Sequence, residues 1–211
     1  IWTLIFPLMN ADNLDQNVIR FFESFYERSP TGFVFNYRYF SGQPKEIWTN
    51  SGYVNEVDSG IWKAYYQIPI SVAHLFIASS CTDILCFTHV FPQYVDNALS
   101  IAFASIGYLP CKANFRKLIR EFPKAKIHLL SENSLIGKIF DCKIALWSRS
   151  IDSKFWINGN SIKIEFDTQT LELPIERFSL NYFEMISGKR FAIRTHKSVK
   201  GFLNFHKLFT A

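Results

Sequence analysis

The spacing of hydrophobic residues divides the chain into three parts. In the first, 1–71, apolar residues at helical spacing over 15–27 give way to strand-like alternation, and turn-rich segments separate further short strands at 47–48 and 61–66. This part predicts one helix and a small antiparallel sheet. The helix is indicated by Val18, Phe21, Phe22 and Phe25, and the alternation by Phe33, Phe35, Tyr37 and Tyr39.

The second part, 72–150, alternates apolar strands with helices. Three strand–helix units in succession indicate a parallel sheet with right-handed crossovers and flanking helices. The sequence therefore predicts an α/β core within a chain that is α+β overall. Its strands are expected at 74–78, 99–104 and 126–130, and its helices at 82–89, 114–122 and 137–147.

The third part, 151–211, returns to strands and ends in a basic tail. Asn158-Gly159 separates two short apolar stretches, which is a strong hairpin signal. A helix is expected over 174–187, with Gly188 as its stop. The last aromatic and basic stretch has no clear period. Antiparallel strands are thus expected on both sides of the core, with all three parts in one compact unit.

The composition, 48% hydrophobic and 17% aromatic, suffices for a sizeable core and argues against disorder. No apolar run approaches the ~20 residues that cross a membrane. The apolar stretch 1–9 lacks a basic leader and a cleavage pattern, so a strand or docking segment is expected there. The cysteines show no CxxC spacing, which favours reduced thiols in a cytoplasmic protein. They are Cys81, Cys86, Cys111 and Cys142.

The net charge of +5 is concentrated at the C-terminal end. The stretch 185–211 carries six basic residues and no acid, so the rest of the chain sums to −1. Such asymmetry is typical of a surface for an acidic polymer, although an ordinary solvated tail would also show it. Phe202 and Phe205 either stack on bases between these cations or lie in the core with Phe209. The candidate nucleic-acid contacts are Arg116, Lys117, Arg120, Lys189, Arg190, Arg194, Lys197 and Lys200.

Two motifs lie at the ends of predicted strands, FIASSCTD at 76–83 and LSENSLIG at 130–137. Through them the unit 72–147 resembles the toprim domain, the α/β module of bacterial primases, topoisomerases and related nucleases. It is most similar to the toprim-like proteins of plasmid and mobile-element replication. In that family the first strand ends in Glu, and an Asp opens the next helix. The third strand ends in Asp-x-Asp, followed by Gly.

This chain departs from the family's acidic pattern. Aligned on Asp83, the family's Glu falls on Ser79; aligned on Gly137, the Asp pair falls on Glu132 and Ser134. Two of the three expected acids are therefore serines. Because a toprim-type site gathers Mg²⁺ with these acids, the resemblance implies a module that has lost phosphoryl transfer. No catalytic residue, metal or other cofactor is then expected.

A residual magnesium-dependent phosphoryl-transfer enzyme is the alternative. It would need Glu132 to converge with a replacement acid: Asp83, Asp141 or Glu121. Asp83 is the best of these, although support of the first core helix's N-terminal turn is the more expected role for it. Asp141 is expected to be a solvent-facing helix residue. Mg²⁺ enters only under this alternative.

The remaining chemistry-bearing residues give weaker signals. His74 and His128 fall on predicted central strands, where hydrogen-bonded structural histidines are expected rather than metal ligands. Ser79 and Ser80 have no activating base nearby in the sequence, and no GxSxG, HExxH, P-loop or GxGxxG motif is present.

Three functions stay open from sequence alone. The first is a non-catalytic module that binds nucleic acid in a bacterial mobile-element or replication setting, as a homo-oligomer or within a larger replication assembly. The second is the residual magnesium enzyme. The third is a protein-interaction scaffold with an exposed aromatic patch. None of them involves a membrane.

Overall fold

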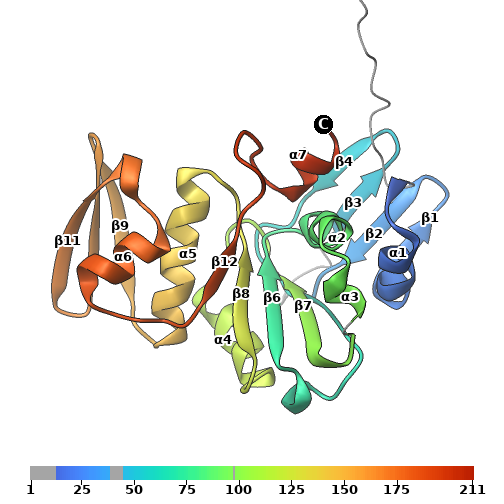
Figure 1. Cartoon of the computed structure of the whole chain (residues 1–211), viewed down its shortest axis with the longest axis horizontal. Coiled ribbons are helices and arrows are strands. Elements are labelled where there is room, and N and C mark those ends of the chain that lie inside the picture. Colours follow the sequence, from blue (N-terminus) through green and yellow to red (C-terminus); the bar gives the residue numbers. More distant parts are fainter. Residues whose placement is uncertain (1–12, 39–44, 97) are drawn as a thin grey trace, which may run out of the picture.

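A five-stranded mixed sheet forms the centre of the molecule (Figure 1). The computed structural model describes residues 13–38, 45–96 and 98–211, so the expected segment 1–9 and Tyr39 lie outside the described residues. Four neighbouring strands of the central sheet are parallel, and an antiparallel strand closes one edge. In spatial order they are β12 (Arg194–His196), β8 (Lys126–Leu130), β6 (His74–Ala78), β7 (Ile101–Ser105) and β5 (Trp62–Tyr65).

Side chains of the central strands alternate between two hydrophobic cores. Phe76 faces the core that includes α2 (Cys81–Val90). Ile77 faces the opposite core, which includes α4 (Lys112–Glu121) and α5 (Leu135–Ser148). Because the inner strands are buried on both faces, they are continuous apolar runs in the sequence.

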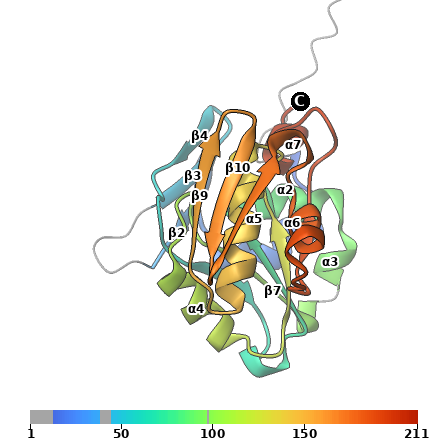
Figure 2. The same cartoon turned by 90° about the vertical axis from the view of Figure 1, so that its left-hand side faces the viewer.

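Two smaller antiparallel sheets flank the centre. One packs with α1 (Gln16–Phe22) and α2 in the same core as Phe76. The other lies beyond α5 and packs with α6 (Leu180–Ser187), so that α5 stands between two sheets (Figures 1 and 2). Their strand orders are β1 (Glu27–Ser29), β2 (Gly32–Asn36), β3 (Lys45–Thr49), β4 (Gly52–Asn55) for the first and β11 (Gln169–Pro174), β10 (Ser161–Phe166), β9 (Ser153–Asn158) for the second.

Short helices complete the described chain. The α-helical ones are α3 (Gln93–Asp96) and α7 (Phe205–Phe209), and α7 packs on α2. The 3₁₀ turns are η2 (Glu23–Phe25), η3 (Pro69–Ser71), η4 (Ala98–Ser100) and η5 (Ile175–Arg177).

Local sequence signals set most helix starts. Ser80 and Ser134 each accept a hydrogen bond from the backbone N–H three residues later, which caps α2 and α5. Asp15 caps α1 in the same role through the N–H of Asn17. At the other end of a helix, Gly188 has a φ of 68°, the left-handed conformation that ends α6 where the sequence predicted a stop.

The α+β class and the parallel core are confirmed, with strands at 74–78 and 126–130 as predicted. The expected helix over 15–27 was too long, because β1 begins at Glu27. The expected helix over 174–187 begins only at Leu180, because the preceding residues form β11 and a 3₁₀ turn. Strands β1, β4, β11 and β12 were not predicted.

Candidate functional site

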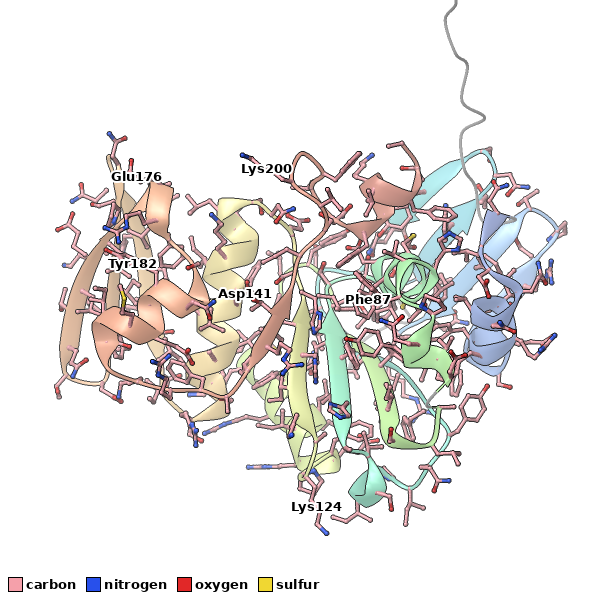
Figure 3. The ribbon with its side chains drawn as sticks, viewed as in Figure 1. Phe87, Lys124, Asp141, Glu176, Tyr182 and Lys200 are labelled. Atoms are coloured by element: carbon pink, nitrogen blue, oxygen red, sulfur yellow. The ribbon has the colours of Figure 1, made fainter. Side chains whose placement is uncertain are left out.

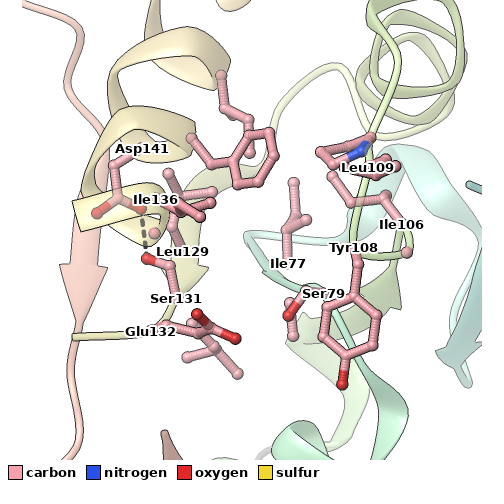
Figure 4. A pocket seen from close by; sticks show the side chains of 17 residues that line it. Ile77, Ser79, Ile106, Tyr108, Leu109, Leu129, Ser131, Glu132, Ile136 and Asp141 are labelled. Atoms are coloured by element: carbon pink, nitrogen blue, oxygen red, sulfur yellow. Dashed lines mark hydrogen bonds between the residues drawn. The ribbon is translucent and has the colours of Figure 1, made fainter. Parts of the chain in front are cut away.

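A cavity of about 290 Å³ lies where the carboxyl ends of β6, β7 and β8 meet, with α5 as one wall. This edge of an open parallel sheet is where ligands generally bind. Most of its lining is apolar, and the polar groups that reach it come from the strand ends and from α5. Figure 4 shows Ser79 and Tyr108 on one side of the cavity and Ser131, Glu132 and Asp141 on the other.

Two of the four predicted site residues, Ser79 and Glu132, line this cavity, whereas Ser134 and Asp83 do not. The Ser134 hydroxyl donates to Glu132 Oε2 at 2.9 Å and accepts from the Gly137 N–H at 3.0 Å. Ser134 is therefore the cap of α5. Position 137 requires glycine, because the Cβ atom of any other residue would lie 2.4 Å from the Glu132 carbonyl oxygen.

Asp83 is buried in the first turn of α2, the place expected for it, and its side chain bonds to a second helix. Its carboxylate accepts from the backbone N–H of His206 at 2.9 Å, at the start of α7, while the Asp83 N–H is capped by Ser80. Burial is the main cause that raises the pKa of Asp83 to about 7. Asp83 thus joins α2 to α7 and is not aimed at the cavity between the strand ends.

Glu46 on β3 is a fully buried carboxylate that the sequence analysis missed. It accepts from the backbone N–H groups of Cys81 and Thr82, each at 2.7 Å, and from the Tyr37 hydroxyl at 2.6 Å. The Thr82 hydroxyl also donates to it. Glu46 therefore satisfies the N-terminus of α2 from another sheet, with the charge sign that the helix dipole favours.

A network of hydroxyl groups extends from Glu46 to the end of β7. Tyr37 bonds to Ser105 at 2.7 Å, and Tyr53 bonds to Tyr108, a residue that lines the cavity, at 2.9 Å. Burial raises the pKa of Tyr37 and of the Cys81 thiol well above their ordinary values, so both stay protonated. The network holds the loop after β7 in place and offers no activated nucleophile.

Asp141 is buried, which corrects the prediction that it faces solvent; only 2% of its side chain is exposed. The Lys197 ammonium donates to Asp141 at 2.7 Å, to Ser131 at 2.8 Å and to the Glu132 carbonyl at 2.9 Å. Burial raises the pKa of Asp141, and the Lys197 charge opposes that rise. Lys197 thus ties the C-terminal segment to the carboxyl end of β8 beside the cavity.

Replacing Lys197 by methionine is expected to lower the free energy of unfolding by about 3 kcal/mol, because it leaves the Asp141 carboxylate buried without its partner. Adding Asp141→Asn should recover most of that loss. Urea unfolding of the two single variants and the double variant gives the coupling free energy directly. Lys200→Met, a change at an exposed lysine nearby, is the control. Losses that simply add would show that the two side chains do not interact.

The other predicted cations fall into two groups. Lys189 pairs with Asp167 at 2.9 Å, and Arg190 approaches Glu184 at 3.4 Å. Within the described part of the chain, the remaining predicted cations form no ion pair, and most are exposed. They are Arg116, Lys117 and Arg120 on α4, and Arg194 and Lys200.

The expected hydrogen bonds of His74 and His128 are present, and they join the two rings to each other. Of the three C-terminal phenylalanines, Phe205 and Phe209 lie in the core. Their rings are therefore not exposed for stacking on bases. Cys81, Cys86 and Cys142 are buried, and Cys111 is exposed.

The acids at the strand ends do not suit a magnesium site. Of the two carboxylates that line the cavity, Asp141 is bound by the Lys197 ammonium, which leaves Glu132 without an acidic partner there. Across the described residues, no group of three or more His, Cys, Asp or Glu side chains is placed to hold a metal ion. Within the same residues, no helix is long and apolar enough to cross a membrane.

Comparison of the chain with protein-family models, with curated proteins and with solved structures finds no match.

Proposed function

We propose that this protein is a non-catalytic, toprim-like module that binds nucleic acid in a mobile-element or replication setting. The positions that resemble the toprim acids now serve the fold: Ser134 caps α5, and Asp83 holds α7. Ser79 offers a hydroxyl where a carboxylate would be needed for Mg²⁺. The residues at the strand ends therefore support a binding role over phosphoryl transfer.

The observation that carries the nucleic-acid part is the outer face of α4. Its inner face buries Phe115 and Leu118 in the core, and its outer face presents Arg116, Lys117 and Arg120. Lys124 follows directly and lies at the end of the sheet where β6 and β8 begin; Figure 3 marks it at that edge. Among the described residues none of these four cations forms an ion pair. Unpaired cations of this density suit phosphate backbones.

Fluorescence anisotropy with short single- and double-stranded oligonucleotides tests the proposal. If two to four phosphates are contacted, affinity should fall roughly 10- to 150-fold between about 50 and 200 mM salt. It should be the same with and without Mg²⁺. Absence of binding at low salt would overturn the nucleic-acid proposal, and binding that needs Mg²⁺ would favour the residual enzyme.

Variants of α4 test whether the nucleic acid contacts this helix. Replacing Arg116, Lys117 and Arg120 by alanine should weaken binding at low salt by about tenfold or more and should flatten the salt dependence. The matched control removes three cations from the far side of α5: Lys154, Lys163 and Arg177. Equal losses in both triple variants would show that net charge, and not the α4 surface, attracts the nucleic acid.

A further inference from the structure

Three histidines, one on each of three neighbouring strands, form a hydrogen-bonded row that crosses the central sheet diagonally. His74 Nδ1 lies 2.9 Å from His128 Nε2, and His128 Nδ1 lies 2.9 Å from His196 Nε2. The strand register places all three on the face that carries Phe76, whose ring stacks on His128. The row therefore runs from β6 through β8 to β12 on the α2 side of the sheet.

Two cations, Lys126 and Arg194, lie on this face at the amino ends of β8 and β12. Lys126 pairs in register with His74, and Arg194 with His128, so both side chains leave the sheet on the histidine side. Neither forms an ion pair with any described residue. Their charges contribute to lowering the pKa of His74, after burial, which is the larger cause.

A pocket of about 410 Å³ opens at this place, a volume in the range of small-ligand sites. His74, His128, Lys126 and Arg194 line it, together with Asn181 from α6. None of the described residues that line it carries a carboxylate. The pocket lies at the amino ends of the parallel strands, opposite the cavity beside Glu132, and it is a different site from the outer face of α4.

Burial lowers the pKa of all three histidines, so the rings are neutral at neutral pH. Counting their protons then shows what the row can offer to a ligand. Three neutral imidazoles carry three protons, and two of these are used in the two bonds between rings. One proton is left, so one outer nitrogen donates and the other accepts. If His74 Nε2 is the donor, then His128 must donate to His74, and His196 must donate to His128.

We propose that this pocket binds the dianionic phosphate of a phosphomonoester. Lys126 and Arg194 supply two positive charges, and Arg194 can donate two hydrogen bonds to one phosphate. His74 Nε2 and the Asn181 amide are further donors. A monoester carries −1.5 to −2 charge at neutral pH, which these cations match. A pocket also suits a terminal group better than a diester, whose chain must continue in two directions.

The phosphate can belong to the 5′ end of a nucleic acid or to a free phosphorylated small molecule. In either case, acceptance of a hydrogen bond from His74 Nε2–H fixes the tautomers of all three rings. His196 does not line the pocket, yet in the bound state it must carry its proton on Nε2. That remote protonation state distinguishes the proposed site from a loose attraction to surface cations.

Titration of the intact protein with inorganic phosphate tests the pocket, followed by the histidine ring ¹⁵N signals in NMR. A saturable change at His74, and a bound state in which His196 carries its proton on Nε2, are expected below about 10 mM phosphate. Lys126→Ala and Arg194→Ala should each weaken binding about tenfold or more, whereas Lys154→Ala should not change it. No change up to that concentration, equal binding by all variants, or a bound state in which His196 carries its proton on Nδ1 would overturn the proposal.

Two further ligands identify the source of the phosphate. A 5′-phosphorylated oligonucleotide that competes with inorganic phosphate better than both its 5′-hydroxyl counterpart and adenosine 5′-monophosphate would assign the pocket to nucleic-acid ends. Adenosine 5′-monophosphate that competes as well as the phosphorylated oligonucleotide would assign it to a small molecule. Because inorganic phosphate tests the pocket alone, this result stands apart from the α4 experiment.

Discussion

Replacement of Glu46 by alanine is expected to lower the free energy of unfolding by about 3–5 kcal/mol. The carboxylate is fully buried, and it accepts from two backbone N–H groups at the start of α2 and from the Tyr37 and Thr82 hydroxyls. Its removal leaves several buried donors without an acceptor, and each such donor costs about 1–3 kcal/mol. Urea unfolding followed by circular dichroism measures the change.

Glu46→Gln separates the charge from the hydrogen bonds. The amide oxygen can accept from one or two of the same donors, but the NH₂ group cannot replace the second carboxylate oxygen. An intermediate loss of about 1–3 kcal/mol is therefore expected. Glu56→Ala is the control, because Glu56 is an exposed glutamate just after β4. It should change the free energy of unfolding by less than about 0.5 kcal/mol. If Glu46→Ala behaved like Glu56→Ala, Glu46 would not be the group that satisfies α2.

The central sheet could be predicted because its strands are defined by burial on both faces. Residues 74–78 and 126–130 are apolar enough to indicate strands without knowledge of their neighbours. β12 differs, because its three residues, Arg194 to His196, have neither an apolar run nor an alternation. Its strand conformation is supplied by pairing with β8, a contact between residues far apart in sequence.

The candidate site was predicted in part. Ser79 and Glu132 were found through the two motifs that resemble the toprim acids, and they meet because the carboxyl ends of neighbouring parallel strands lie at one edge of the sheet. Glu46 gave one usable signal: it stands two residues before Trp48, so alternation places both side chains on the same buried face. The Asp141–Lys197 pair gave none, since its members are separated by 56 residues and Asp141 alone looks like an ordinary helix acid.

The histidine row shows the same limit in another form. His74 and His128 could each be placed on a strand, and hydrogen bonding was expected for both. That they bond to each other follows from the register between β6 and β8, and the third member depends on β12. Register is set by packing across the whole sheet, so single-strand patterns do not contain it.

Asp83→Asn is expected to stabilise the protein at alkaline pH and to have little effect at acid pH. Burial is the main cause that raises the folded-state pKa of Asp83 from 3.8 to about 7, so the folded protein favours the protonated form. The stability that this preference contributes is fully present below about pH 3.8 and is lost as the pH rises through about 7. Over those three units the loss reaches at most about 4 kcal/mol.

The asparagine variant keeps an oxygen that can accept from the His206 N–H, but it cannot ionise. We therefore expect the difference in unfolding free energy, variant minus parent, to rise from near zero at about pH 4 to about 3–4 kcal/mol at about pH 8. Urea unfolding at several pH values measures it, with Asp58→Asn as the exposed control. The titration of His206 itself is common to both proteins, so to first order it cancels in the difference. A difference that stays constant across this pH range would mean that Asp83 is ionised without cost in the folded state, and that burial at the α2–α7 contact does not govern its protonation.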